Sequence, residues 1–200
     1  MAKIGKTQPR VVIIAGPNGA GKSTIASSLL TGPLRVRHYV NADVIARGLS
    51  EFNADEMAIA AGKIMLTRLH ELADDRETFA FETTLASRSF APWLRSLIKA
   101  GYSFHLLYLW LPTVEAAIAR VRERVAAGGH GIPELTIERR YYRGIQNFFA
   151  LYRPVAHNWR VYDNLEGEGP ARIASGGTGK KERIYNADQW RRFSALSGGR

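Results

Sequence analysis

Short apolar runs that are rich in β-branched residues alternate with longer amphipathic stretches along most of the chain. The run at 11–15 (VVIIA) is apolar throughout, which is typical of a strand buried on both faces of a parallel sheet. Strands alternating with helices predict right-handed crossovers and a mostly parallel sheet with helices on both faces. Further strands are predicted at 37–40, 79–81, 104–111 and 159–162, and helices at 22–30, 54–73, 89–100, 114 to about 127 and 134 to about 156.

The chain of 200 residues fits a single domain, residues 1–200, with a core at about 10–175. Residues 176–181 (GGTGKK) predict a flexible turn. The tail at about 176–200 is expected either to add a short strand and a helix around Trp190 or to fray near its end.

Composition excludes several classes of protein. Hydrophobic residues make up 46% and charged residues 23%, which argues against a disordered chain. No run of about 18 apolar residues is present, so neither a membrane-spanning helix nor a membrane partner is expected. The chain has no cysteine, which excludes disulfides and thiolate metal sites. The polar start MAKIGKTQPR does not resemble a signal peptide, and a cytoplasmic location is expected.

The balance of charge points to an acidic partner. The 28 basic and 18 acidic residues give a net charge of +10 at pH 7. Nucleotides, nucleic acids, anionic lipids and acidic proteins are all candidates for that partner. A protein that is merely basic is the alternative, and charge alone does not choose among these interpretations.

The segment at 16–23, GPNGAGKS, matches the phosphate-binding motif G-x-x-x-x-G-K-[ST] between a predicted strand and a predicted helix. Glycines let the backbone turn its N–H groups toward phosphate oxygens, and the start of the helix adds positive potential. Lys22 is predicted to reach the β- and γ-phosphates and the Ser23 hydroxyl to ligate Mg²⁺, so ATP and Mg²⁺ are the expected cofactors. An ordinary glycine-rich turn is the alternative. The residues predicted to bind the nucleotide are Gly16, Pro17, Asn18, Gly19, Ala20, Gly21, Lys22, Ser23 and Thr24.

Two acidic residues follow predicted strands, at the edge where parallel sheets bind ligands. Asp43 is predicted to orient or deprotonate an attacking hydroxyl, with an N-cap of the next helix as the alternative. Arg47, one helical turn on, is predicted to hold that carboxylate or an anionic substrate, or to be a plain surface residue. Glu82 and Thr83 are predicted to bind substrate hydroxyl or amide groups. A metal-linked acid or a helix cap is the other interpretation of Glu82.

Two signals of other nucleotide-binding classes are absent from the sequence. The apolar run at 104–111 ends in Leu-Pro, so the second metal carboxylate of motor-like and GTPase-like proteins is not evident. No NKxD-type guanine-reading motif is present either. Enzymes that transfer a phosphoryl group to a second substrate remain.

The region at about 120–143 is rich in arginine and has a glycine-rich tip. Arg120 and Arg124 are spaced i, i+4 and share a helix face, while Arg139 and Arg140 follow on the next helix. This arrangement predicts a helical lid whose arginines close over the triphosphate, and a solvated basic face is the alternative. The residues predicted to act in catalysis are Lys22, Asp43, Arg120 and Arg124.

The expected architecture is therefore an α/β, P-loop NTPase- or kinase-like three-layer sandwich with a mostly parallel sheet and a helical, arginine-bearing lid. Aromatic residues on the last predicted helix are expected to pack in the core, with base stacking on a nucleic acid as the alternative. They are Tyr141, Tyr142, Phe148, Phe149 and Tyr152.

Several motifs together resemble the zeta-toxin family of P-loop kinases, in particular its small single-domain bacterial members, over about residues 10–175. The resemblance implies ATP-dependent phosphorylation of a hydroxyl of UDP-N-acetylglucosamine, and restraint by a small antitoxin protein. The matching segments are GPNGAGKS at 16–23, NADVIARGL at 41–49, FAFETTL at 79–85, RVRERVAAGGHGIP at 120–133, RRYYRGIQNF at 139–148 and VYDN at 161–164.

The resemblance also implies roles for individual residues. By this resemblance, Asp43 would be the base, and Lys22 and Ser23 would contact the phosphates and Mg²⁺. Glu82 and Thr83 would belong to the strand that binds the substrate. Arg120 would sense the phosphates, with Arg124 or Arg140 as a second such arginine.

The predicted function is an ATP-dependent kinase that transfers the γ-phosphoryl group to a hydroxyl of a small molecule, of which a nucleotide sugar is one candidate. A polynucleotide or RNA kinase is one alternative, because the chain is basic, although nucleic acid is the less favoured partner. A non-enzymatic, nucleotide-gated partner of an acidic protein such as an antitoxin is the other.

Overall fold

The computed structural model describes residues 8–32, 34–49, 57–129, 131–165 and 169–198. The predicted start of the helix at 54 and residue 130 of the predicted lid tip lie outside the described residues, as do both ends of the chain.

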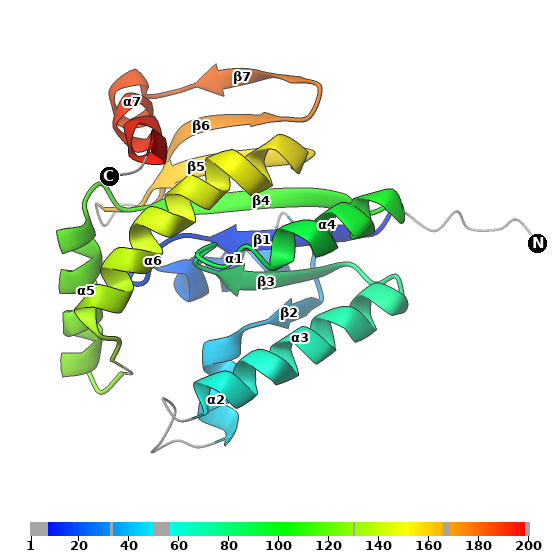
Figure 1. Cartoon of the computed structure of the whole chain (residues 1–200), viewed down its shortest axis with the longest axis horizontal. Coiled ribbons are helices and arrows are strands. Elements are labelled where there is room, and N and C mark those ends of the chain that lie inside the picture. The colour runs from blue at the N-terminus through cyan, green and yellow to red at the C-terminus, as the bar shows by residue number, and fades with distance from the viewer. Residues whose placement is uncertain (1–7, 33, 50–56, 130, 166–168, 199–200) are drawn as a thin grey trace, which may run out of the picture.

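In the described part of the chain, seven strands form one sheet in the order β2-β3-β1-β4-β5-β6-β7. The first five run parallel, whereas β6 and β7 are antiparallel additions at one edge. The predicted α/β fold with a mostly parallel sheet is thus confirmed (Figure 1). The strands are β1 Arg10–Ala15, β2 His38–Val40, β3 Phe79–Thr83, β4 Ser103–Trp110, β5 Asn158–Asp163, β6 Ala171–Gly177 and β7 Lys180–Ile184.

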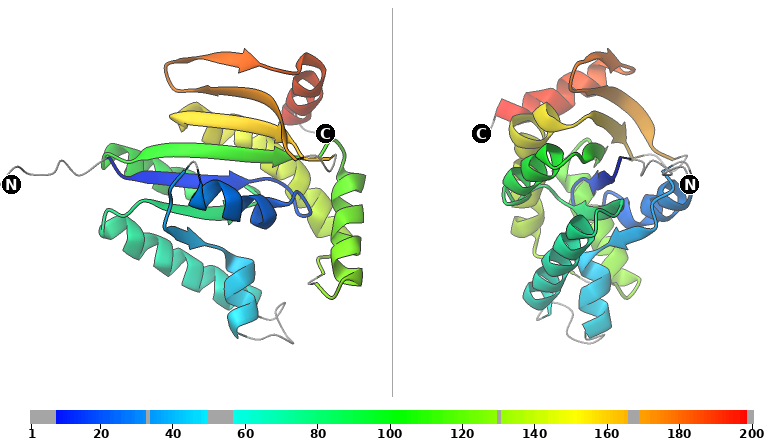
Figure 2. Two further views of the ribbon diagram at one scale, coloured as in Figure 1. Left: turned by 180° about the vertical axis from the view of Figure 1, so that it is seen from behind. Right: turned by 90° about the vertical axis from the view of Figure 1, so that its right-hand side faces the viewer.

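Helices cover both faces of the sheet. α3, α4 and α6 lie in front of it and α1 lies behind, while α5 stands across the edge where the parallel strands end (Figures 1 and 2). No helix in the described residues is long and apolar enough to cross a membrane. The helices are α1 Lys22–Thr31, α2 Ala42–Leu49, α3 Ala58–Asp74, α4 Phe90–Lys99, α5 Val114–Ala126, α6 Glu134–Asn147 and α7 Ala187–Ala195.

The last predicted helix is shorter and less regular than its sequence indicates. α6 ends at Asn147, a π-helical turn spans Phe148–Tyr152, and a short 3₁₀ turn spans Arg153–Val155. Pro154 lacks an N–H group and cannot continue the α-helical hydrogen bonds at this point.

The core forms where the predicted strands pack against the helices. Residues 11–15 of β1 are at most 1% exposed, as expected for a strand covered on both faces. The aromatic side chains of α6 and its π-turn mainly belong to this core, because Tyr141, Phe148 and Tyr152 are at most 1% exposed. The Tyr141 hydroxyl donates to the Leu111 carbonyl at 2.8 Å. These three buried rings cannot stack on a nucleic-acid base.

The tail beyond residue 176 is an ordered part of the sheet. The predicted flexible turn at 176–181 is wrong in extent, since β6 and β7 leave only residues 178–179 between them. β6, ARIASGG, escapes detection from the sequence because small residues and glycines dominate it. The expected strand and helix around Trp190 are both present.

Aromatic stacking fixes this tail to the rest of the molecule. Trp190 of α7 stacks on Trp159 of β5 with 5.6 Å between ring centroids. The Arg153 guanidinium lies 4.9 Å from the Trp159 ring centroid and pairs with Glu182 of β7. The C-terminal hairpin and α7 therefore share one packed cluster with the end of the α6 region.

Candidate active site

The phosphate loop, residues 16–21, connects β1 to α1 and requires glycine at three positions. Gly16, Gly19 and Gly21 have φ values of 145°, 78° and 74°, which side-chain-bearing residues rarely adopt. A Cβ at Gly16 would lie 2.1 Å from the Leu109 carbonyl oxygen of β4. The loop can therefore lie this close to β4 only because it has no side chain there.

Two other elements hold the phosphate loop in place. A Cβ at Gly19 would lie 2.9 Å from the Ala117 carbonyl oxygen and 3.1 Å from Cβ of Arg120, so α5 packs directly on the loop. Asn164, just after β5, donates from its side-chain amide to the Ala20 carbonyl at 2.9 Å. The sequence prediction missed Asn164 as a site residue. Its signals were the VYDN segment and its place at the carboxyl end of a strand.

The loop and the start of α1 fit a phosphate group. Gly21 caps α1 without a side-chain hydrogen bond, and the first turn carries no acidic residue, so no carboxylate competes for its N–H groups. Thr24 lies exposed in that turn. Asn18 is only 8% exposed, and its Oδ1 has no hydrogen-bond partner among the described residues.

Lys22 lies where charges from several elements meet. Its ammonium donates to a carbonyl of its own loop at 2.9 Å, and burial lowers its pKa below the usual value. The carboxylates of Glu82 and Asp43 act against that lowering. The guanidinium groups of Arg124 and Arg140 lower the pKa further. Charged residues of β3, α2, α5 and α6 thus contribute to the electrostatic environment of Lys22.

Ser23 and Glu82 meet directly, as the metal-linked interpretation of Glu82 requires. The Ser23 hydroxyl donates to the Glu82 carboxylate, with Oγ 2.6 Å from Oε1 and 3.0 Å from Oε2. The Asn41 side-chain amide donates to Glu82 Oε1 at 2.8 Å. The Tyr39 hydroxyl lies 3.3 Å from the same amide, and burial and the Glu82 charge raise the Tyr39 pKa. The sequence prediction missed Asn41 and Tyr39.

Asn41, rather than Asp43, caps α2. Asn41 Oδ1 accepts the N–H of Asp43 at 2.8 Å and of Val44 at 3.3 Å, so the N-cap interpretation of Asp43 is wrong. Asp43 lies in the first turn of α2 and is exposed. The capping hydrogen bonds of α2 therefore do not involve the Asp43 carboxylate.

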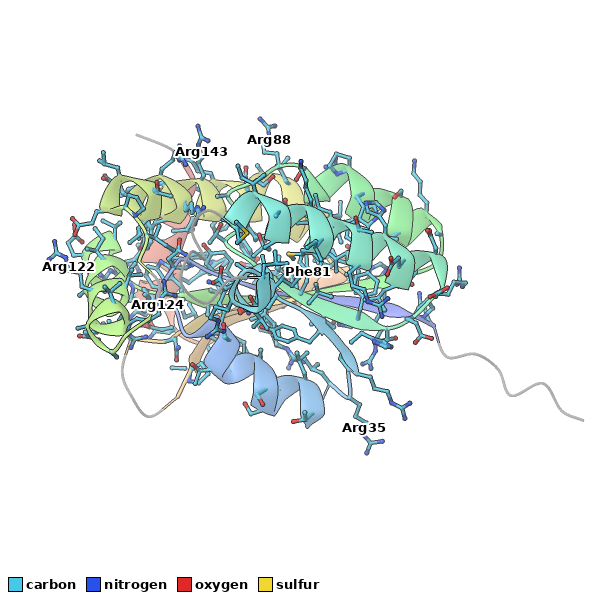
Figure 3. The ribbon with its side chains drawn as sticks, turned by 90° about the horizontal axis from the view of Figure 1, so that it is seen from below. Arg35, Phe81, Arg88, Arg122, Arg124 and Arg143 are labelled. Atoms are coloured by element: carbon cyan, nitrogen blue, oxygen red, sulfur yellow. The ribbon has the colours of Figure 1, made fainter. Side chains whose placement is uncertain are left out.

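The arginines of α5 point in different directions. Arg120 donates to the Leu165 carbonyl at 2.6 Å, beside the phosphate loop. Arg124 lies on the inner side of α5, whereas Arg122 points outward (Figure 3). Arg122 pairs with Glu134, with Nε 2.8 Å from Oε1, and so joins α5 to α6.

The predicted arginines of α6 and α2 differ in how far they are buried. Arg140 is partly buried, its pKa is lowered by burial and then by Arg139, and the Asp43 charge acts in the opposite direction. Arg140 and Asp43 are thus close enough to interact electrostatically. Arg139 and Arg47 are exposed.

Thr83 has a local structural contact. Its hydroxyl accepts the N–H of Leu85 at 3.1 Å in the turn after β3, where Leu85 has a φ of 59°. Asn147 of α6 donates to the Leu85 carbonyl at 2.7 Å and holds the same turn. Substrate binding by Thr83 stays a prediction.

The structure thus gathers most, but not all, of the predicted residues around the phosphate loop. Direct contacts place Ser23, Glu82 and Arg120 at or beside the loop. Asp43, Arg124 and Arg140 are near enough to influence the pKa of Lys22.

The donor set fits a magnesium ion bound together with phosphates. Mg²⁺ binds through one or two protein oxygens, substrate phosphates and water. Ser23 and Glu82 supply a hydroxyl and a carboxylate within hydrogen-bond distance of each other. No group of three or more His, Asp or Glu residues forms a cage for a metal in the described part of the chain.

A hollow next to this network has room for a second ligand. It lies between β2, α2 and α3 and has a volume of about 430 Å³. Tyr39 and Asn41 line it, so it adjoins the Glu82 carboxylate, and Arg37, Arg68 and Val44 form other parts of its wall.

The fold and the loop define a P-loop kinase-like domain, and that fold implies nucleotide binding. Residues 11–143 match the AAA domain family AAA_33, and the chain belongs to this family. Over 139 residues it is 30% identical to an uncharacterized protein of Haemophilus influenzae. The matching segment covers 70% of this chain and 97% of that protein.

Solved structures share the fold at low sequence identity. A chain of the AvrRxo1-ORF1:ORF2 complex with ATP has a TM-score of 0.74 and 16% identity, over 96% of this chain and 65% of that one. This chain therefore spans slightly less than two thirds of that relative. A chain of the PezAT toxin–antitoxin system of Streptococcus pneumoniae has a TM-score of 0.63 and 14% identity, over 99% of this chain and 83% of that one. A gluconokinase of Sinorhizobium meliloti has a TM-score of 0.50 and 16% identity, over 96% of this chain and 94% of that one.

Proposed function

We propose that this chain is an ATP-dependent kinase that transfers the γ-phosphoryl group to a hydroxyl of a small molecule. The observation that carries the proposal is the place of Asp43 at the start of α2, next to Asn41, whose side chain donates to Glu82, which in turn accepts from Ser23 of the phosphate-binding motif. An exposed carboxylate near a loop and a lysine that can hold a triphosphate is the arrangement phosphoryl transfer needs.

The reaction can be assigned to groups of this chain. The loop N–H groups and Lys22 bind the phosphates, and Ser23 with Glu82 would hold Mg²⁺, which neutralises charge on the β- and γ-phosphates when bound. Asp43 orients the acceptor hydroxyl and accepts its proton. The acceptor oxygen bonds to the γ-phosphorus as the bond to the β-phosphate oxygen breaks, and ADP leaves. Arg124 and Arg140 stabilise the charge of the transferring group.

The finer proposal concerns the acceptor. The resemblance to zeta-toxin kinases supports a nucleotide sugar such as UDP-N-acetylglucosamine, and the hollow lined by Tyr39 and Asn41 offers space beside Asp43's helix. A small antitoxin partner belongs to the same proposal, and the fold shared with a toxin–antitoxin system supports it.

The test is transfer of label from γ-labelled ATP with Mg²⁺ to a panel of acceptors. The panel contains UDP-N-acetylglucosamine, other sugars, antibiotics and RNA ends, with Lys22→Ala as the blank. Label on UDP-N-acetylglucosamine supports the finer proposal, and label on another small hydroxyl compound retains only the kinase. Label on RNA ends alone would replace the small-molecule acceptor by a polynucleotide. Tight ATP binding without transfer to any acceptor would contradict a kinase.

Substitution of Asn41 separates its two contacts. Asn41→Ser keeps an oxygen that can cap α2 but loses the amide N–H group that reaches Glu82, so we expect stability close to that of the unchanged protein and a several-fold higher Mg²⁺ concentration for half-maximal transfer. Asn41→Ala loses both contacts and is expected to cost about 1 kcal/mol of stability in addition. Mg²⁺ titrations of activity and urea denaturation measure the two effects. An unchanged Mg²⁺ requirement in Asn41→Ser would refute the proposed role.

A further inference from the structure

The strands β5 to β7 have one face that is covered by helices and one face that is not. Trp159 of β5 points toward α7, where it stacks on Trp190. Arg160, the next residue, therefore points to the opposite side of the sheet. From behind, α1 crosses β1 and β3, and no helix of the described chain lies over β5 to β7 (Figure 2).

Strand register places a row of polar side chains on that side. Arg160 pairs in register with Ser175 of β6, and Ser175 pairs with Arg183 of β7. Register partners point to the same face, so the two arginines stand about 10 Å apart, two strand spacings, with Ser175 between them. Both arginines are exposed. We call this surface the open sheet face and define it by Arg160, Tyr162, Arg172, Ser175, Arg183 and Tyr185.

Arginine and tyrosine stack on one another at the end of the face nearest the phosphate loop. The Arg172 guanidinium lies 5.7 Å from the Tyr162 ring centroid and 5.3 Å from that of Tyr185. Tyr185 is 50% exposed, and its hydroxyl lies 3.3 Å from that of Ser175. The stack is thus continuous with the row of arginines, and its planar groups are accessible to solvent.

The positive potential extends to the other end of the sheet. His105 of β4 lies beside Asn158, whose side chain also accepts from Lys180. The His105 pKa is lowered to about 4, chiefly by burial and in addition by the nearby charges of Arg10, Arg160 and Lys180. The cations that act on His105 thus continue the positive charge along this side of the sheet.

We propose that the open sheet face binds single-stranded nucleic acid. Its charge complements a phosphate backbone, and its exposed rings and guanidinium planes are groups on which bases stack. An acidic peptide would use the charge but would leave the Tyr162–Arg172–Tyr185 stack without a role. The inference is independent of the proposed kinase activity, since none of these residues belongs to the phosphate-loop site.

The test is fluorescence anisotropy of a labelled 12-nucleotide oligouridylate with the full chain over a range of salt concentrations. The triple variant R160Q/R172Q/R183Q is expected to bind at least about tenfold more weakly, with a salt slope smaller by about 2 because three phosphate contacts are lost. Tyr185→Leu is expected to weaken oligonucleotide binding several-fold without changing the salt slope.

The matched control R88Q/R95Q/K99Q removes the same charge from the α4 side of the sheet, where these residues are exposed. It should bind the oligonucleotide like the unchanged protein. Equal loss in both triple variants would show that net charge alone is responsible and would overturn the proposal. Equally tight binding of poly-glutamate, insensitive to Tyr185→Leu, would replace nucleic acid by an acidic protein. Displacement of the oligonucleotide by ATP would place it in the phosphate loop and also overturn the proposal.

Discussion

Asp43→Asn is expected to lower the rate of phosphoryl transfer by about 10²- to 10⁴-fold while ATP binding persists. The change keeps the size of the side chain and the α2 cap, which Asn41 provides, and removes only the negative charge. It also removes a carboxylate that raises the Lys22 pKa, so that pKa should fall further. Single-turnover transfer with labelled ATP measures the rate, and equilibrium dialysis measures ATP binding.

A matched aspartate separates this effect from a general loss of charge. Asp75→Asn changes an exposed residue at the end of α3, away from the phosphate loop, and should leave transfer unchanged. Transfer by Asp43→Asn at the normal rate would remove Asp43 as the base. In that case Glu82, which already contacts Ser23, would be the next carboxylate to test.

Gly16→Ala is expected to destabilise the protein by about 3 kcal/mol or more and to abolish nucleotide binding. The added Cβ would lie 2.1 Å from the Leu109 carbonyl oxygen, and the φ of 145° disfavours alanine even without that contact. Relief requires β4 and the loop to separate, which displaces the N–H groups that would bind phosphate. Thermal unfolding and ATP binding measure the two consequences.

Gly62→Ala is the control for a glycine change as such. Gly62 lies inside α3, and a Cβ there would meet nothing within 4 Å. Alanine has the higher helix propensity, so we expect a gain of up to about 1 kcal/mol and unchanged ATP binding. If Gly16→Ala bound ATP and unfolded like the unchanged protein, the close packing of the loop against β4 would be wrong.

The sequence predicted the fold well where one local pattern is sufficient. A continuous apolar run can be satisfied only by burial on both faces, so residues 11–15 indicated a central parallel strand. The N-cap of α5 is equally local, since the Thr113 hydroxyl accepts the N–H of Ala116, three residues on, at 3.2 Å. β6 was missed because its small residues carry no periodic signal, and its place as a strand depends on pairing with β5 and β7.

In the candidate site, too, some features follow from one short segment and others depend on long-range packing. The sequence by itself determined the phosphate loop, because glycine conformations, a lysine and a hydroxyl at fixed spacing are properties of one short segment. Only the tertiary structure decided that Asn41 rather than Asp43 caps α2, that Glu82 meets Ser23, and that Arg140 is partly buried within electrostatic reach of Asp43 while Arg139 is exposed. Those outcomes depend on which strands lie side by side and how each helix is rotated. Both are set by long-range packing, which leaves no signal within a single segment of the chain.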